Sequence, residues 1–97
     1  MMLVVVAYDV NTETAAGRKR LRRVARVCED CGQRVQNSVF ECLVDAARWT
    51  RVRARLISEI SEARDSLRFY FLGDNWKGRV EHVGAKASYD PQGALIV

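Results

Sequence analysis

The sequence predicts a small α+β domain in which two helices cover an antiparallel sheet. Three observations lead to this prediction: a Val-rich apolar run at residues 2–7, two segments whose apolar residues recur at helical spacing, and an alternating apolar pattern at residues 66–72. The chain has 97 residues, of which 48% are hydrophobic and 29% are charged. This length and composition are typical of one folded domain.

The first half of the chain contains a strand, a helix and a second extended segment. The run at residues 2–7 is continuous rather than alternating, which is typical of a central strand. Cap-forming side chains at residues 11–14 precede an apolar stripe, so we expect a helix over about residues 14–29. Residues 34–44 lack helical spacing and predict a second strand, with Asn37 and Ser38 forming a bulge or kink.

The second half repeats the alternation of helix and strand. Asp45 is placed to cap a second helix that runs to about residue 64 and carries Trp49 in its apolar stripe. Residues 66–72 predict a third strand, and residues 80–83 can supply a fourth. The apolar end of the chain, residues 94–97, remains after these assignments.

We interpret these elements as the order β-α-β-β-α-β, the ferredoxin-like layout. The domain is expected to span residues 1–84, and residues 85–97 form a C-terminal tail whose strand pairs with a partner subunit. Because no third helix is present to cover the second sheet face, the simplest burial is a second copy of the sheet. The sequence therefore predicts a symmetric homodimer with an extra C-terminal strand.

The charge distribution favours a polyanionic partner. The net charge is +4 and the isoelectric point is about 9.3. Six cations without an intervening carboxylate lie in the first helix, at Arg18, Lys19, Arg20, Arg22, Arg23 and Arg26. Such a face suits the phosphate backbone of a duplex, although a solvated helix flank paired with nearby glutamates is the alternative. Four further arginines, at positions 48, 51, 53 and 55, open the second helix.

The apolar start of the chain is too short for a membrane span and has no basic segment before it, so we expect a cytoplasmic protein without membrane contact. The three cysteines do not suggest a disulfide framework. Cys28 and Cys31 have the spacing of a zinc pair, but a four-ligand site would need both Cys42 and His82, which makes zinc the weaker interpretation.

Asp9 is the candidate metal ligand and catalytic residue. It follows the first strand, where its carboxylate can project from a rigid element. One carboxylate is too few for a site, but a two-fold axis would place a second copy beside it and provide two ligands for Mg²⁺. The alternative is that Asp9 forms a turn or helix cap together with Asn11 and Thr12.

Three segments resemble the CRISPR-associated Cas2 family: Tyr8-Asp9-Val10, residues 65–70, and residues 36–41, which read Gln-x-Ser-Val-Phe-Glu. The resemblance implies a dimeric, ferredoxin-like protein of spacer acquisition that works with the CRISPR integrase. It also implies Mg²⁺-dependent endonuclease activity at Asp9, with Tyr8 and Phe40 as accessory positions. The expected ligand is double-stranded DNA, with RNA as a further possibility. A toxin-type endoribonuclease or a regulatory binding module outside CRISPR remains the alternative.

Overall fold

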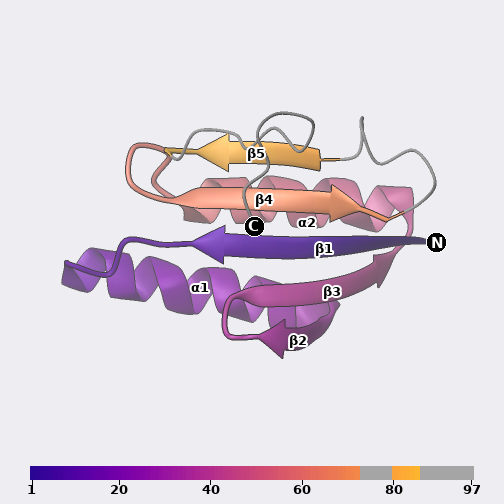
Figure 1. Cartoon of the computed structure of the whole chain (residues 1–97), viewed down its shortest axis with the longest axis horizontal. Coiled ribbons are helices and arrows are strands. Elements are labelled where there is room, and N and C mark those ends of the chain that lie inside the picture. Colours follow the sequence, from indigo (N-terminus) through magenta and orange to yellow (C-terminus); the bar gives the residue numbers. More distant parts are fainter. Residues whose placement is uncertain (73–79, 86–97) are drawn as a thin grey trace, which may run out of the picture.

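The computed structural model describes residues 1–72 and 80–85. Its elements follow one another as β1 (Met2–Asp9), α1 (Ala15–Cys31), β2 (Gln33–Gln36), β3 (Val39–Val44), α2 (Ala46–Glu59), β4 (Ser66–Phe71) and β5 (Val80–Gly84). The strands form one antiparallel sheet in the order β2-β3-β1-β4-β5. Both helices lie on the same side of this sheet, behind it in Figure 1. The predicted α+β, ferredoxin-like layout is confirmed.

The second predicted strand is in fact a hairpin. We expected residues 34–44 to be one bent strand, but the chain reverses at Asn37 and Ser38, so that Arg34 pairs with Phe40. The two-residue turn supplies the two middle strands of the β-α-β-β-α-β order. The strand predicted at residues 80–83 is therefore not the fourth strand of the motif, because β4 takes that place and β5 is an additional strand at the edge beside β4.

Side-chain caps fix the starts of both helices. The Thr14 hydroxyl oxygen accepts a hydrogen bond from the Gly17 amide at 3.0 Å, and α1 continues two residues beyond the predicted end. The Asp45 carboxylate accepts one from the Arg48 amide at 2.7 Å. Helix α2 ends at Glu59, earlier than the predicted residue 64, because a turn follows in which the Ser61 amide bonds to the carboxylate of Asp65, four residues later, rather than continuing the helix.

The core lies between the sheet and the two helices. Alternation along β1 turns Val4, Val6 and Tyr8 toward the helices, and all three are buried. The Trp49 ring on α2 meets the Phe69 ring of β4 edge to face, with centroids 4.9 Å apart. The apolar stripe predicted for the second helix, with Trp49 in it, therefore packs against the sheet.

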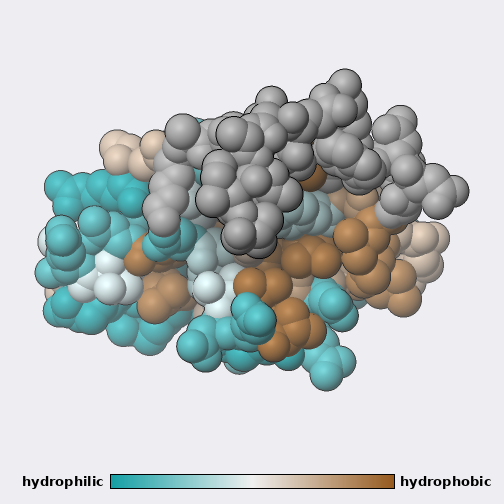
Figure 2. All heavy atoms as spheres, in the orientation of Figure 1, coloured by the Kyte–Doolittle hydropathy of each residue, from teal (hydrophilic) through white to brown (hydrophobic). Residues whose placement is uncertain are grey.

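The opposite sheet face carries no helix from the described part of the chain, as Figure 1 shows. On the face seen in Figure 2, hydrophobic residues gather where β1 begins and β3 ends. Leu43 of β3, which pairs with Leu3, is 57% exposed there. The predicted tail strand falls outside residues 1–72 and 80–85. Within those residues, neither helix is long and apolar enough to cross a membrane.

Candidate nucleic-acid interface and acidic strand end

Asp9 lies where the sequence predicted it, at the last position of β1. It pairs in register with Ser66 of β4, and its side chain is exposed. The alternation that turns Tyr8 toward the helices places Asp9 on the other side of the sheet, in line with Ala7. Asp9 is therefore held in a strand by its pairing with β4, as a ligand on a rigid element requires.

The turn after Asp9 is fixed by a buried carboxylate that the sequence argument did not identify. Asp65, which is 0% exposed, accepts a hydrogen bond from the Asn11 amide at 2.9 Å and another from the Ser61 amide at 2.9 Å. The Arg20 guanidinium donates to the same carboxylate through Nε at 2.7 Å. Gly17 closes the turn from the other side, since a Cβ there would lie 1.9 Å from the Asn11 carbonyl oxygen. We call this arrangement the Asp65 clamp.

The electrostatics of the Asp65 clamp keep the carboxylate ionised. Burial alone would raise the pKa of Asp65, but the hydrogen bonds from Arg20 and from the Ser61 and Asn11 amides outweigh it and hold the pKa below the ordinary value. Arg20 therefore serves the loop that follows the acidic strand end. Its guanidinium is engaged in the fold, which distinguishes it from the other predicted phosphate-binding residues of α1.

A single subunit offers Mg²⁺ only half of a site. No group of three or more His, Cys, Asp or Glu side chains suited to a metal occurs among the residues that the structure describes. Mg²⁺ is commonly held by one or two carboxylates together with waters and phosphate oxygens, so the exposed Asp9 carboxylate suits it once a second copy is added. Zinc fits less well, because Cys42 points into the core from β3 while His82 lies on β5, three strands away.

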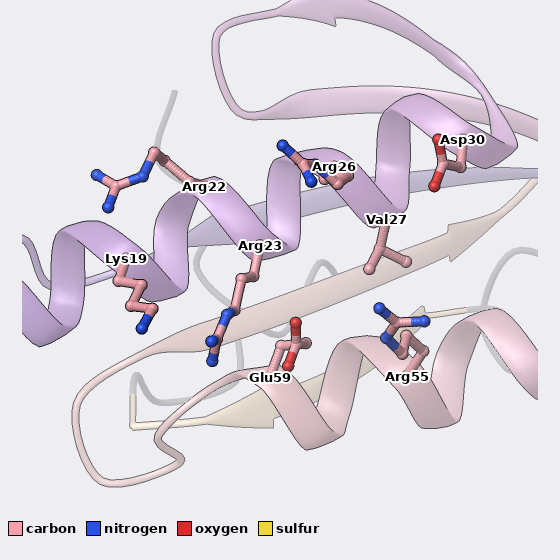
Figure 3. Close-up of a pocket in the computed structure, with 8 residues that line it drawn as sticks. All are labelled: Lys19, Arg22, Arg23, Arg26, Val27, Asp30, Arg55 and Glu59. Atoms are coloured by element: carbon pink, nitrogen blue, oxygen red, sulfur yellow. The ribbon is translucent and has the colours of Figure 1, made fainter.

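Four of the six predicted phosphate-binding residues line a groove between the two helices. The groove has a volume of about 330 Å³, and we call it the basic groove. Its cations are Lys19, Arg22, Arg23 and Arg26 from α1 and Arg55 from α2, and its carboxylates are Asp30 and Glu59. Figure 3 shows Lys19 and Arg23 directed toward α2, with Arg55 and Glu59 across from them. The structure thus adds Arg55, a residue that sequence spacing linked only to its own helix.

The remaining predicted residues lie elsewhere. Arg18 is exposed on α1 and donates to the Thr12 carbonyl oxygen at 3.1 Å, outside the lining of the basic groove. Tyr8 and Phe40, the accessory candidates, are buried beside each other with ring centroids 6.2 Å apart. Burial also raises the pKa of Tyr8. In this subunit both rings belong to the core, so neither is exposed for stacking on a base.

Arg68 was not among the site residues predicted from the sequence. It belongs to β4 and pairs with Ala7, two residues along the register from the pair of Asp9 with Ser66 and therefore on the same side of the sheet. Its guanidinium lies near the Tyr70 ring, 5.9 Å from the centroid. The alternation of β4 contained this signal, because it placed Arg68 and Tyr70 on the side opposite Phe69. Asp9 therefore shares its sheet face with a cation.

The fold and these two surfaces define a class: a small ferredoxin-like protein with an acidic strand end on its sheet and a cation-lined groove between its helices. Comparison with known proteins gives the family. The model of the family "CRISPR associated protein Cas2" matches residues 2–80, and the chain therefore belongs to the Cas2 family.

Relatives match over nearly the whole chain. A protein of Chlorobaculum tepidum named CRISPR-associated endoribonuclease Cas2 is 62% identical over 99% of this chain and 100% of its own length. One from Halalkalibacterium halodurans, named CRISPR-associated endonuclease Cas2, is 55% identical over 98% of this chain and 99% of its own. The crystal structure of Streptococcus pyogenes Cas2 at pH 6.5 superposes with a TM-score of 0.70 and 61% identity, covering 86% of this chain and 100% of that one.

Proposed function

We propose that this protein is a CRISPR-associated nuclease that binds the backbone of double-stranded nucleic acid and acts as a homodimer. The observation that supports this most directly is the basic groove, which five cations and two carboxylates from the two helices line together. Salt-dependent attraction to phosphates needs such a cluster and does not need base-reading side chains. Relatives named as nucleases agree with a phosphodiester substrate.

The proposed cleavage site is Asp9 together with the Asp9 carboxylate of a second copy. A divalent ion such as Mg²⁺ held there would supply Lewis-acid chemistry at the phosphodiester. The residues of this chain hold the carboxylate in place: β3 and β4 pair with β1 on both sides, and the Asp65 clamp fixes the turn that follows. Arg68, on the same sheet face, adds positive charge for a phosphate near that site.

A cleavage assay on RNA and on DNA duplexes with and without Mg²⁺ tests the nuclease claim. Asp9→Asn should abolish metal-stimulated cleavage and leave duplex affinity unchanged, because it removes a ligand and keeps the shape. Glu13→Gln is the matched control, since Glu13 is an exposed acid in the loop after β1. Equal cleavage by the Asp9 variant and the wild type would remove the enzyme claim and leave the binding claim standing.

Duplex binding measured over a range of salt concentrations tests whether the basic groove contacts the phosphate backbone. Arg22→Ala with Arg23→Ala removes two groove cations, and the slope of log affinity against log salt should become shallower by about 2 for each subunit on the duplex. Arg18→Ala with Arg64→Ala removes the same charge from positions outside the groove. An equal change in both double variants would assign the effect to net charge and contradict a groove-specific interface.

The proposed partner in spacer acquisition is the CRISPR integrase, and the dimer would bridge two integrase units. Sedimentation of the purified protein should give a dimer, and addition of the integrase should give a larger complex that survives Asp9→Asn. A stable monomer would contradict both the paired Asp9 site and the bridging role. Loss of the complex in the Asp9 variant would instead tie the acidic strand end to assembly.

A further inference from the structure

Three cysteines meet where the end of α1 packs against β3. The Sγ atoms of Cys31 and Cys42 are 2.8 Å apart, and both residues are buried. Cys28 lies one helical turn before Cys31 and is 0% exposed. Gly32 permits the close approach of helix and strand, because a Cβ at that position would lie 2.6 Å from the Cys42 sulfur and 2.3 Å from the Glu41 carbonyl oxygen.

The distance between the sulfurs of Cys31 and Cys42 favours a disulfide over a metal. A disulfide bond is about 2.05 Å long, so less than about 1 Å of movement would close it. Two thiolates on a tetrahedral zinc ion, with Zn–S bonds of about 2.3 Å, would instead stand about 3.8 Å apart. The observed 2.8 Å is already shorter than that separation.

Their electrostatics give the three thiols different roles. The hydrogen bond from Cys42 lowers the pKa of Cys31 and outweighs burial, with help from the Arg48 charge. The same hydrogen bond, with burial, raises the pKa of Cys42 and keeps its proton in place. Burial raises the pKa of Cys28 to about 12, which makes Cys28 unreactive. A thiol whose pKa is lowered, and which therefore ionises more readily, beside a thiol that keeps its proton is the arrangement of a reactive dithiol.

Cys31 is also within reach of a small reagent. It lines a second hollow of about 190 Å³ between the helices, together with Arg48, Arg51 and Arg55. This hollow is positively charged, which is the environment in which thiolates are stabilised and react. Hydrogen peroxide, a molecule of two oxygen and two hydrogen atoms, fits a space of this volume.

We propose that Cys31 and Cys42 are a dithiol site that hydrogen peroxide oxidises to an internal disulfide. The Cys31 thiolate attacks one peroxide oxygen, the O–O bond breaks, and the departing hydroxide takes a proton to become water. The Cys42 sulfur then attacks the Cys31 sulfenic acid, the S–O bond breaks, and the leaving hydroxide takes the Cys42 proton as a second water. Two thiols are oxidised and one peroxide is reduced, independently of the proposed nuclease activity.

The new bond would tie the end of α1 to β3 around the short β2 strand. A cross-link that closes a loop restricts the unfolded chain, so the thermal midpoint should rise on oxidation and return on addition of dithiothreitol. Since Cys31 lines the second hollow together with three arginines, the disulfide also removes a thiol that can ionise from the positively charged face between the helices.

Peptide mapping of peroxide-treated protein tests the proposal. Trypsin separates residues 27–34, which hold Cys28 and Cys31, from residues 35–48, which hold Cys42. The oxidised wild type should give these two peptides joined, with one thiol left to alkylate. Cys28→Ser should give the same joined pair with no thiol left, whereas Cys31→Ser and Cys42→Ser should give none.

The peptide maps of the wild type and of Cys28→Ser show whether Cys31 and Cys42 form the disulfide, even if a Cys42 variant fails to fold. Three intact thiols in the wild type, under conditions that oxidise an unstructured cysteine peptide completely, would overturn the proposal. Loss of the joined peptides in Cys28→Ser would overturn it as well, because Cys28 and not Cys31 would then form the bond. Joined peptides in both proteins, with the reversible rise in thermal midpoint, support it.

Discussion

Asp65→Ala should destabilise the fold by about 3 kcal/mol, because its carboxylate is the acceptor for two backbone amides and for a guanidinium. The amides of Asn11 and Ser61 each bond to it at 2.9 Å, and each amide left without an acceptor costs about 1 kcal/mol. The Arg20 side chain is 19% exposed, so water can replace its lost partner in part. The total loss in free energy of unfolding therefore stays near about 3 kcal/mol, the lower end of the range for breaking a buried ion pair.

For a domain of this size, a loss of that magnitude corresponds to a fall of roughly 15 °C in thermal midpoint. Circular dichroism during heating measures it, at one fixed protein concentration because oligomerisation shifts the midpoint. Glu62→Ala is the control, since it removes an exposed carboxylate three residues earlier. Asp65→Asn should give an intermediate fall, because an amide oxygen still accepts from one backbone amide. A midpoint for Asp65→Ala within about 3 °C of the wild type would refute the Asp65 clamp.

Three further predictions follow from the same contacts. Gly17→Ala should destabilise the protein by about 2 kcal/mol in denaturant titration, because the new Cβ meets the Asn11 carbonyl oxygen. Helix propensity alone predicts that the same change stabilises the protein by about 1 kcal/mol, so the sign of the change in unfolding free energy distinguishes the two effects. Glu59→Gln should tighten duplex binding in fluorescence anisotropy, since it removes a carboxylate from the basic groove, and unchanged affinity would contradict contact there. The Asp65 clamp holds the pKa of Asp65 low, and hydrogen bonds from the Arg53 guanidinium of α2 hold the pKa of Glu81 on β5 low. The contribution of both groups to stability is therefore present above about pH 4 and is lost on further acidification; a pH series of thermal midpoints without this fall would be the contrary result.

Local patterns predicted most of the elements, because local interactions determine them. The caps at Thr14 and Asp45, and the alternation around Phe69, are signals contained within a few residues. The hairpin at Asn37 and Ser38 was missed because the turn lacks the Asn-Gly or Asp-Gly pair that marks such reversals most clearly. Two short strands joined by a tight turn have the same amino-acid composition as one bent strand, so composition alone does not distinguish them.

The composition of the two surfaces could not be predicted from spacing, since their partners are distant in the sequence. Arg20 is one of six cations in a block, and only its contact with Asp65, 45 residues away, shows that it belongs to the fold. Arg55 joins the cations of α1 only because the helices pack side by side. Phe40 was predicted as an accessory position of the site, and the direction in which it faces became clear only from the register of β3 with β1.

The proposed binding surface and the proposed cleavage site lie in different layers of the subunit, which has a consequence for the dimer. The basic groove lies on the helices, and Asp9 lies on the sheet side that the described helices leave open. If two subunits meet through those open faces, the two Asp9 carboxylates turn inward and the two basic grooves turn outward on opposite sides. The basic grooves and the acidic pair then contact a nucleic acid at different places. Asp9→Asn should therefore bind the duplex normally without cleaving it, whereas Arg22→Ala with Arg23→Ala should lower cleavage only as far as it lowers binding. A groove variant that stays folded, binds the duplex at saturation and still fails to cleave it would contradict this arrangement.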